Sequence, residues 1–145
     1  MYSDVFCKVY NEFGWNYYPE AFGEQLLQWI ERQGITVRTA LDLACGTGVL
    51  CRILQKAGIE SRGMDFSSGM IDIARQESPD IPYDVADMIL YRPDAQFDLN
   101  PLSAQNSHFK LLYFSLNGSV VSYISSSTSS LSVSSSVPYT PNKYS

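Results

Sequence analysis

Two glycines separated by one residue, Gly46 and Gly48, follow an apolar run in LDLACGTGVL, residues 41–50. An apolar run that stops at glycines predicts a buried strand entering a tight turn. Glycine permits positive φ angles and has no Cβ, so a ligand can approach the backbone closely there. The first N–H groups of the following helix would receive a carboxylate, a phosphate or a polar nucleoside group. A tight strand-to-helix turn without a ligand is the alternative.

Two aspartates lie at the ends of the two strands predicted after the glycine turn, over 61–66 and 83–87. Asp65 closes RGMDF, and its carboxylate can accept hydrogen bonds from both hydroxyl groups of a ribose. Asp87 follows YDVA, and its carboxylate can accept from the exocyclic amine of an adenine. Met70 and Met88 offer polarizable walls for the flat ring. Ordinary solvated or helix-capping aspartates are the alternative at each position, but the three features in register favour a nucleoside ligand.

The elements that must position these residues begin with two predicted helices. A short helix is predicted over 3–13, and a longer amphipathic helix over about 19–33. Pro19 suits the first turn of the longer helix, where a missing N–H costs little, and Gly34 suits its end.

Strands and helices then alternate along the chain. The predicted strands are 37–44, 61–66, 83–87 and one that begins at 97–99, and the predicted helices between them are 48–58 and 67–76. Repeated strand–helix units predict an α/β fold with a mostly parallel sheet and helices on both faces. Ligands of such sheets lie at the carboxyl ends of the strands, so the functional loops should follow Ala44, Asp65, Asp87 and Leu99.

Three stretches, in this order, resemble the class I S-adenosylmethionine-dependent methyltransferases of the small bacterial type. LDLACGTG is similar to motif I of that family, GMDFSSGMIDIAR to its second motif and VADM to its adenine-binding motif. FDL resembles the start of the family's fourth strand, and YNEFGWNYY resembles its N-terminal cap. The resemblance covers roughly residues 2–99.

The resemblance implies a Rossmann-like three-layer sandwich that binds S-adenosyl-L-methionine and transfers its methyl group to an acceptor. Asp42 and Ala44, with the two glycines, would face the methionine part, and Tyr10 or Tyr17 would close over that end. The residues that it assigns to the cofactor are Asp42, Ala44, Gly46, Gly48, Asp65, Met70, Asp87, Met88 and Tyr10. It assigns no catalytic residue and no metal ligand, and it leaves open whether the acceptor is a small metabolite, a protein or a modified base.

A nicotinamide-dependent Rossmann oxidoreductase is the alternative enzyme class, because its cofactor also contains a ribose. Its glycine pattern, counted from Gly46, needs a third glycine at position 51, where this chain has Cys51. The Asp87–Met88 pair also favours the adenosyl cofactor.

Charge and periodicity change abruptly near Leu99. We expect an N-terminal helical cap over 1–36, a cofactor-binding core over 37–99 and a divergent Ser-rich tail over 100–145. The tail contains no Asp, Glu or Arg, and no further strand–helix rhythm follows. The family resemblance therefore predicts a chain truncated after the fourth strand, with an incomplete C-terminal half.

Three interpretations of the tail stay open at this point. Asn100-Pro101 should break the fourth strand, because proline cannot donate to a ladder and restricts the preceding residue. The tail is then a flexible Ser-rich segment, a β-hairpin about Asn117-Gly118, or a segment read out of the coding frame. The last interpretation would make the chain a truncated, inactive relative of the methyltransferases.

The overall composition excludes some classes of partner. Fifteen acidic against ten basic residues leave a net charge of −5, which argues against general binding to nucleic-acid phosphates. Three cysteines without a CxxC pair favour a reduced, cytoplasmic compartment over a secreted disulfide framework. No run approaches the ~18 apolar residues of a membrane span.

Overall fold

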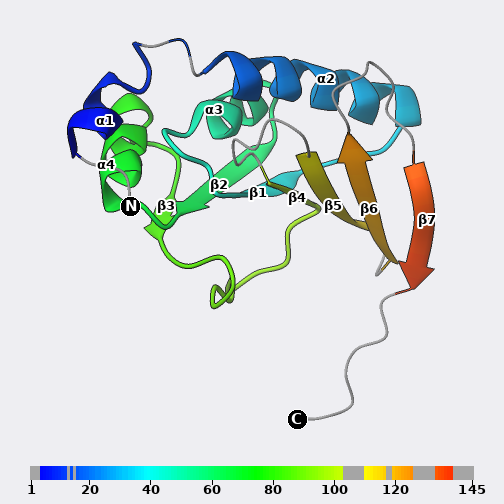
Figure 1. The fold of residues 1–145 in the computed structure, drawn as a ribbon. Coiled ribbons are helices and arrows are strands. Elements are labelled where there is room, and N and C mark those ends of the chain that lie inside the picture. Colours follow the sequence, from blue (N-terminus) through cyan, green and yellow to red (C-terminus); the bar gives the residue numbers. More distant parts are fainter. Residues whose placement is uncertain are drawn as a thin grey trace.

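The computed structural model describes residues 4–12, 14, 16–102, 110–116, 119–125 and 133–138. Its helices are α1 (Asp4–Val9), α2 (Tyr17–Gln33), α3 (Val49–Lys56) and α4 (Ser68–Glu77). Its strands are β1 (Thr39–Leu43), β2 (Glu60–Asp65), β3 (Tyr83–Val85), β4 (Leu99–Leu102), β5 (Lys110–Leu116), β6 (Ser119–Ser125) and β7 (Val133–Pro138). These strands form one sheet in the order β3-β2-β1-β4-β5-β6-β7 (Figure 1).

The first four strands form the parallel part of the sheet and confirm the α/β, Rossmann-like prediction. β1 pairs with β2 on one side and with β4 on the other, and β2 pairs with β3. The steps from β1 to β2 and from β2 to β3 run in the same direction, so right-handed crossovers put α3 and α4 on the same face. Figure 1 shows α2, α3 and α4 together on one side of the sheet. The described residues thus supply one of the two helical layers of the predicted three-layer arrangement.

The two N-terminal helices differ from the expected ranges at their ends. α1 ends at Val9, before a turn at residues 10–12, and the predicted end at residue 13 lies outside the described residues. α2 begins at Tyr17, so Pro19 lies in its first turn, where the N–H has no acceptor within the helix. Gly34, with φ of 62°, ends α2 as predicted.

The main core forms where α2 and α3 pack on the sheet. It includes Leu26, which is 1% exposed, together with Leu50, Leu54 and Leu99, which are fully buried. Because Leu99 opens β4, this strand starts in the core. None of the helices in the described part of the chain is long and apolar enough to cross a membrane.

The prediction that Asn100-Pro101 breaks the fourth strand is wrong. β4 continues to Leu102, and Pro101 lies opposite Leu112 of β5 while β1 pairs on the other side. Successive residues of a strand direct their N–H groups to opposite neighbours. Pro101 therefore removes one donor from one of the two ladders and leaves the other ladder unaffected.

The strands after β4 pair in antiparallel fashion, unlike the first four. β5 pairs with β4 and with β6, and Leu116 lies opposite Ser119 at the end of the second pairing. This register matches the interpretation of the tail as a hairpin about Asn117-Gly118, although these two residues lie outside the described ones. The remaining predictions for 103–109, 126–132 and 139–145 also fall outside the described residues.

Candidate functional site

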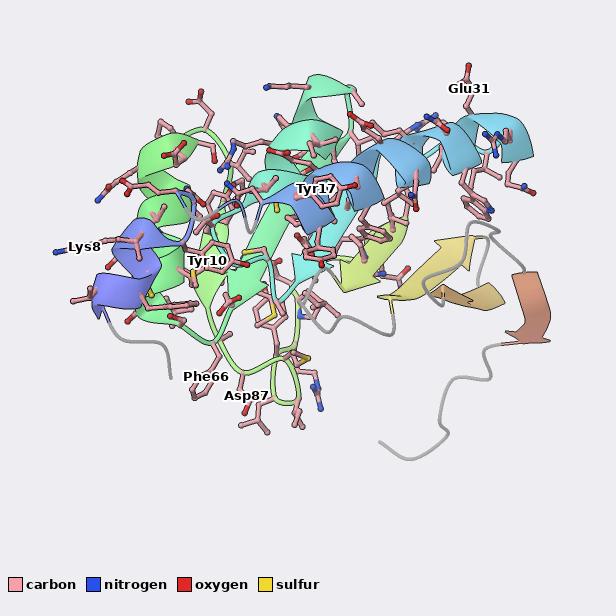
Figure 2. The ribbon with its side chains drawn as sticks, turned by 45° about the horizontal axis from the view of Figure 1, so that its top comes forward. Lys8, Tyr10, Tyr17, Glu31, Phe66 and Asp87 are labelled. Atoms are coloured by element: carbon pink, nitrogen blue, oxygen red, sulfur yellow. The ribbon has the colours of Figure 1, made fainter. Side chains whose placement is uncertain are left out.

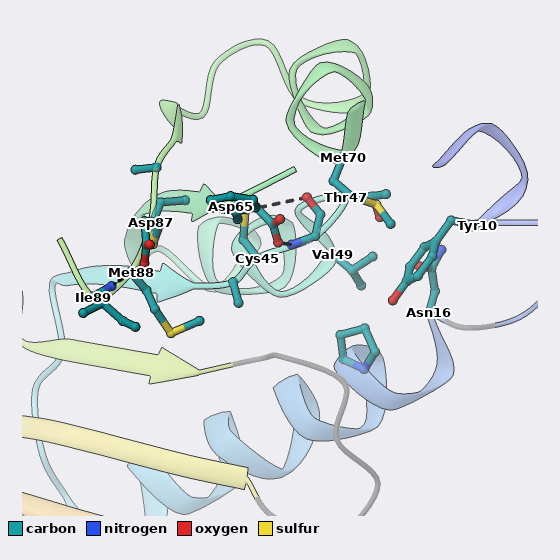
Figure 3. A pocket seen from close by; sticks show the side chains of 16 residues that line it. Tyr10, Asn16, Cys45, Thr47, Val49, Asp65, Met70, Asp87, Met88 and Ile89 are labelled. Carbon is teal, nitrogen blue, oxygen red and sulfur yellow. Dashed lines mark hydrogen bonds between the residues drawn. The ribbon is translucent and has the colours of Figure 1, made fainter. Parts of the chain in front are cut away.

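A cavity of about 480 Å³ opens at the carboxyl ends of β1, β2 and β3 (Figure 3). The loops that follow these three strands supply most of its wall, as the sheet topology predicts. Its lining residues are Tyr10, Asn16, Pro19, Ala44, Cys45, Gly46, Thr47, Val49, Met64, Asp65, Phe66, Met70, Ala86, Asp87, Met88 and Ile89. Seven of the nine predicted site residues are among them; Asp42 and Gly48 are not.

The glycine loop follows β1 and turns sharply into α3. Ala44, Gly46 and Gly48 have φ angles of 60°, 56° and 79°. A Cβ at Gly46 would meet no atom within 4 Å, so this glycine leaves the cavity wall open. A Cβ at Gly48 would instead collide with the phenol oxygen of Tyr83. The two glycines therefore have different structural roles, because Gly46 borders the cavity and Gly48 permits Tyr83 to pack beneath the loop.

Asp65 at the end of β2 joins the glycine loop to the start of α4. One carboxylate oxygen accepts from the backbone N–H of Gly46 at 2.9 Å, and the other accepts from that of Ser67 at 2.8 Å. Ser67 in turn caps α4 by accepting from the N–H of Met70 at 3.4 Å. These bonds hold the Asp65 carboxylate at the cavity wall, where its remaining lone pairs can accept from a ligand.

Asp87 and Met88 lie in the loop after β3, at one end of the cavity (Figure 3). Asp87 accepts from the backbone N–H of Ile89 at 2.9 Å, which folds the loop into a tight turn. Met88 is 44% exposed and Ile89 is 76% exposed, so the turn presents apolar side chains to solvent at the cavity mouth. An apolar rim beside a carboxylate suits a flat, polar-edged ring.

A network behind this loop fixes its path. The phenol of Tyr91 donates to Asp84 at 2.7 Å, and Arg62 pairs with Asp84 and with Asp94, each at 2.8 Å. Burial, followed by the hydrogen bond to Asp84, raises the pKa of Tyr91 to about 12. The phenol therefore stays protonated and keeps donating across the neutral pH range.

The turn at residues 10–12 and the start of α2 lie at the other end of the cavity. Tyr10, which Figure 2 shows next to α1, is 9% exposed. It packs in one apolar cluster with Cys7 and Met70. The hydroxyl of Thr47 donates to the side-chain oxygen of Asn11 at 2.8 Å, which ties this segment to the glycine loop. Of the two candidate tyrosines, Tyr10 lines the cavity, whereas Tyr17 is 68% exposed and does not.

Asp42 lies beneath the glycine loop and is 1% exposed. It accepts a hydrogen bond from the thiol of Cys51 at 3.9 Å. The hydrogen bond to Cys45, together with burial, raises the pKa of Cys51 well above its ordinary value. The bond from Cys51 alone would lower the pKa of Cys45, but burial and the charges of Asp42 and Asp65 outweigh it and raise that pKa. Both thiols are thus protonated, which disfavours a role as nucleophile.

Sequence reasoning missed several residues of the wall. Thr47 stands between the two glycines, so the motif itself carried the signal for it. Asn16 and Pro19 carried no such signal, because the helix start that brings them to the cavity is far from the glycine loop in sequence.

No group of three or more acidic, histidine or cysteine side chains among the described residues is arranged to hold a metal ion.

The charge of the cavity wall is negative. Asp65 and Asp87 are its acidic residues, and the described lining residues include no Lys, Arg or His. Such a wall attracts cationic groups and repels phosphates.

Residues 40–112, half of the chain, match the family described as "Methyltransferase domain". This match continues past Leu99 through β4 into β5. A ubiquinone biosynthesis O-methyltransferase of Coxiella burnetii is 38% identical over 80 residues, which are 50% of this chain and 34% of that protein. The chain thus matches about a third of the length of this relative.

Two solved structures share the fold. DesVI of Streptomyces venezuelae superposes with a TM-score of 0.57 at 17% identity, covering 85% of this chain and 70% of that one. An S-adenosylmethionine-dependent methyltransferase of Clostridium acetobutylicum superposes with a TM-score of 0.55 at 14% identity, covering 79% and 73%.

Proposed function

Because the chain belongs to the methyltransferase domain family, we propose that its cavity binds S-adenosyl-L-methionine and that the protein transfers the cofactor's methyl group to an acceptor. The observation that carries the proposal is a cavity at the carboxyl ends of β1, β2 and β3 with an open glycine wall and two carboxylates. The bound cofactor would supply a methyl group on a sulfonium, ready for direct transfer to a nucleophile.

The residues of the cavity fit this cofactor. The absent Cβ of Gly46 leaves room against the wall, and Asp65 has acceptor capacity for two hydroxyl groups of a ribose. Asp87, Met88 and the buried Met70 would frame the adenine. Ala44 and Tyr10 would border the methionine part, while Asp42 would lie beneath the loop and Gly48 would leave room there for Tyr83.

The charge of the wall supports this cofactor over a nicotinamide dinucleotide. A pyrophosphate carries negative charge, which the two aspartates of the wall repel, and no described lining residue is a Lys, Arg or His that would offset this repulsion. S-adenosyl-L-methionine carries a sulfonium and an ammonium, which such a wall attracts.

The contribution of the protein to the reaction would be binding and orientation. The Thr47–Asn11 bond and the Tyr10 cluster would close one end of the cavity and limit the entry of water. No side chain is assigned as a catalytic base, and the acceptor is not specified. We also propose a cytoplasmic location, which the three free cysteines support.

Isothermal titration calorimetry on the full chain tests the proposal with S-adenosylhomocysteine as the probe and NAD as the comparison. We expect saturable heat with the nucleoside thioether and none with NAD. An Asp87→Asn variant should bind S-adenosylhomocysteine more weakly, because its amide lacks the charge that accepts from the adenine amine. A folded chain that binds NAD in preference would reverse the proposal.

A further inference from the structure

Exposed apolar and aromatic side chains gather around the mouth of the cavity. Among the described residues, the large ones with exposed fractions between 44% and 76% are Val5, Tyr17, Tyr18, Phe66, Val85, Met88, Ile89 and Leu90. The first lies on α1, and the others lie at the start of α2 or beside the loops after β2 and β3, which border the cavity. None of these side chains lies on α3, on α4 or in the second half of α2. Such a concentration of exposed apolar surface marks a binding surface.

Five of these side chains continue the cavity wall outward and form what we call the apolar rim: Tyr17, Tyr18, Phe66, Ile89 and Leu90. Phe66 and Ile89 line the cavity, yet they are 63% and 76% exposed, so each reaches from the wall to the outside. The residues on both sides of Tyr17 and Tyr18 along the chain also line the cavity. The rim therefore borders the cavity at the start of α2 and at the loops after β2 and β3.

The turn that carries Ile89 and Leu90 is fixed by its own hydrogen bonds. The backbone carbonyl of Asp87 accepts from the N–H groups of Leu90 and Tyr91 at 3.0 and 2.8 Å. The guanidinium of Arg92 donates to the carbonyls of Ile89 and Tyr91 at 3.2 and 2.9 Å. The turn thus holds two aliphatic side chains in water, and an apolar group that covers them would gain free energy.

A methyl acceptor has to pass this rim to reach the cofactor. The cofactor would lie on the inner wall, against the glycine loop and Asp65, so the mouth is the route from solvent. Asp65 and Asp87 repel an anionic acceptor, because the described lining residues include no basic side chain. A small polar acceptor would leave the rim in water. An uncharged acceptor with an apolar body meets both conditions.

We propose that the methyl acceptor is an uncharged molecule with an extended apolar body, which the apolar rim holds while the nucleophilic group enters the cavity; this inference rests on the proposed function. Phe66 and Ile89 contact the part of the body nearest the cavity, and the other rim residues contact the part farther out. The hydroxyl groups of Tyr17 and Tyr18 keep their contact with water while the rings cover the apolar body.

Calorimetry on the full chain tests this inference in the presence of saturating S-adenosylhomocysteine, which keeps the probes out of the cofactor's place. Three probes separate the effect of the apolar body from that of charge. 4-Pentylphenol has an uncharged hydroxyl group and an apolar chain, phenol lacks the chain, and 4-pentylbenzoate carries a negative charge. We expect the wild-type chain to bind 4-pentylphenol at least about 10-fold more tightly than either of the other two.

A double variant, Tyr17→Ser with Leu90→Ser, removes one rim side chain from each end of the mouth. Neither residue lines the cavity, so the affinity for S-adenosylhomocysteine should stay that of the wild type and shows that the variant is folded. We expect the affinity for 4-pentylphenol to fall about 10-fold, which corresponds to the loss of roughly 60 Å² of buried apolar surface. Glu31→Ser is the control and should change neither affinity, because Glu31 is exposed at the far end of α2 from Tyr17 (Figure 2).

The possible failures are distinguishable. A folded wild-type chain that does not bind S-adenosylhomocysteine overturns the proposed function, and this inference with it. A wild-type chain that binds S-adenosylhomocysteine but prefers phenol or 4-pentylbenzoate, or binds none of the three probes, overturns the inference alone. So does a double variant that binds 4-pentylphenol as the wild type does. If that variant instead loses sedimentation with phosphatidylcholine vesicles, the rim docks on a lipid surface and does not hold the acceptor.

Discussion

Alanine substitution at Gly48 should destabilise the protein more than the same substitution at Gly46, although the two glycines share one loop. Both have positive φ angles, at 79° and 56°. They differ in the space around a new Cβ. At Gly46 no atom lies within 4 Å, whereas at Gly48 the ring of Tyr83 stands in the way, with Cζ at 2.9 Å and Cε1 at 3.0 Å.

The magnitude follows from two separate costs. A left-handed backbone costs an alanine about 1–2 kcal/mol. Overpacking a filled site adds about 1–3 kcal/mol. Tyr83 cannot move aside easily, because it is 5% exposed and its hydroxyl bonds the Ser78 hydroxyl at 2.8 Å. We therefore expect Gly48→Ala to lower the free energy of unfolding by about 2–5 kcal/mol, and Gly46→Ala by about 1–2 kcal/mol.

Urea unfolding of the full chain, followed by circular dichroism, measures this difference. Calorimetry with S-adenosylhomocysteine should rank the two alanine variants in the opposite order by their loss of affinity. A methyl group at Gly46 enters the cavity and should weaken binding more than one at Gly48. Tyr83→Phe removes the phenol oxygen, so Gly48→Ala should cost less in that background. Equal free-energy losses for the two alanine variants would refute the reasoning, as would a loss below about 1 kcal/mol for Gly48→Ala.

Three other predictions concern the strand ends and the loop behind the cavity. Asp65→Asn weakens the acceptor of the Gly46 N–H, so it should lower the free energy of unfolding by about 1–3 kcal/mol. It should also weaken the binding of S-adenosylhomocysteine. Urea unfolding and calorimetric titrations that match those of the wild type would contradict this. Leu99→Ala should cost about 2–5 kcal/mol in urea, because Leu99 is fully buried, and a negligible cost would mean that β4 is not part of the core. The pKa of Tyr91 is raised from 10.0 to about 12, so the contribution of its protonated phenol to stability is complete below pH 10 and is lost as the pH rises to 12. In melting experiments at different pH values, the melting temperature of Tyr91→Phe should therefore fall less over this window than that of the wild type. An equal fall would count against the Tyr91–Asp84 bond.

The order of strands and helices, the glycine loop and the two acidic positions followed from the sequence itself. Apolar periodicity marks β1 to β3, and glycines mark the turn after β1. In a parallel sheet the carboxyl ends of neighbouring strands meet at one edge, so chain order alone predicts that the loops bearing Gly46, Asp65 and Asp87 converge. The cavity is lined by these residues because each lies directly after a strand.

Only the tertiary structure decided the roles that depend on contacts between distant segments. Gly48 and Tyr83 meet across the loop, and Thr47 bonds Asn11 across 36 positions of the chain. Likewise, the sequence offered two tyrosines for one end of the cavity, and only packing on Met70 selects Tyr10.

The same limit applied to β4 and to Asn16. Proline at position 101 predicts a strand break from local rules, but pairing with β1 and β5 on both sides keeps β4 continuous. Asn16 has the local pattern of an ordinary helix cap, and it borders the cavity because of how α2 docks on α3 and the sheet. Local propensity fixes which element forms, whereas the partners of a side chain depend on packing that no short stretch of sequence contains.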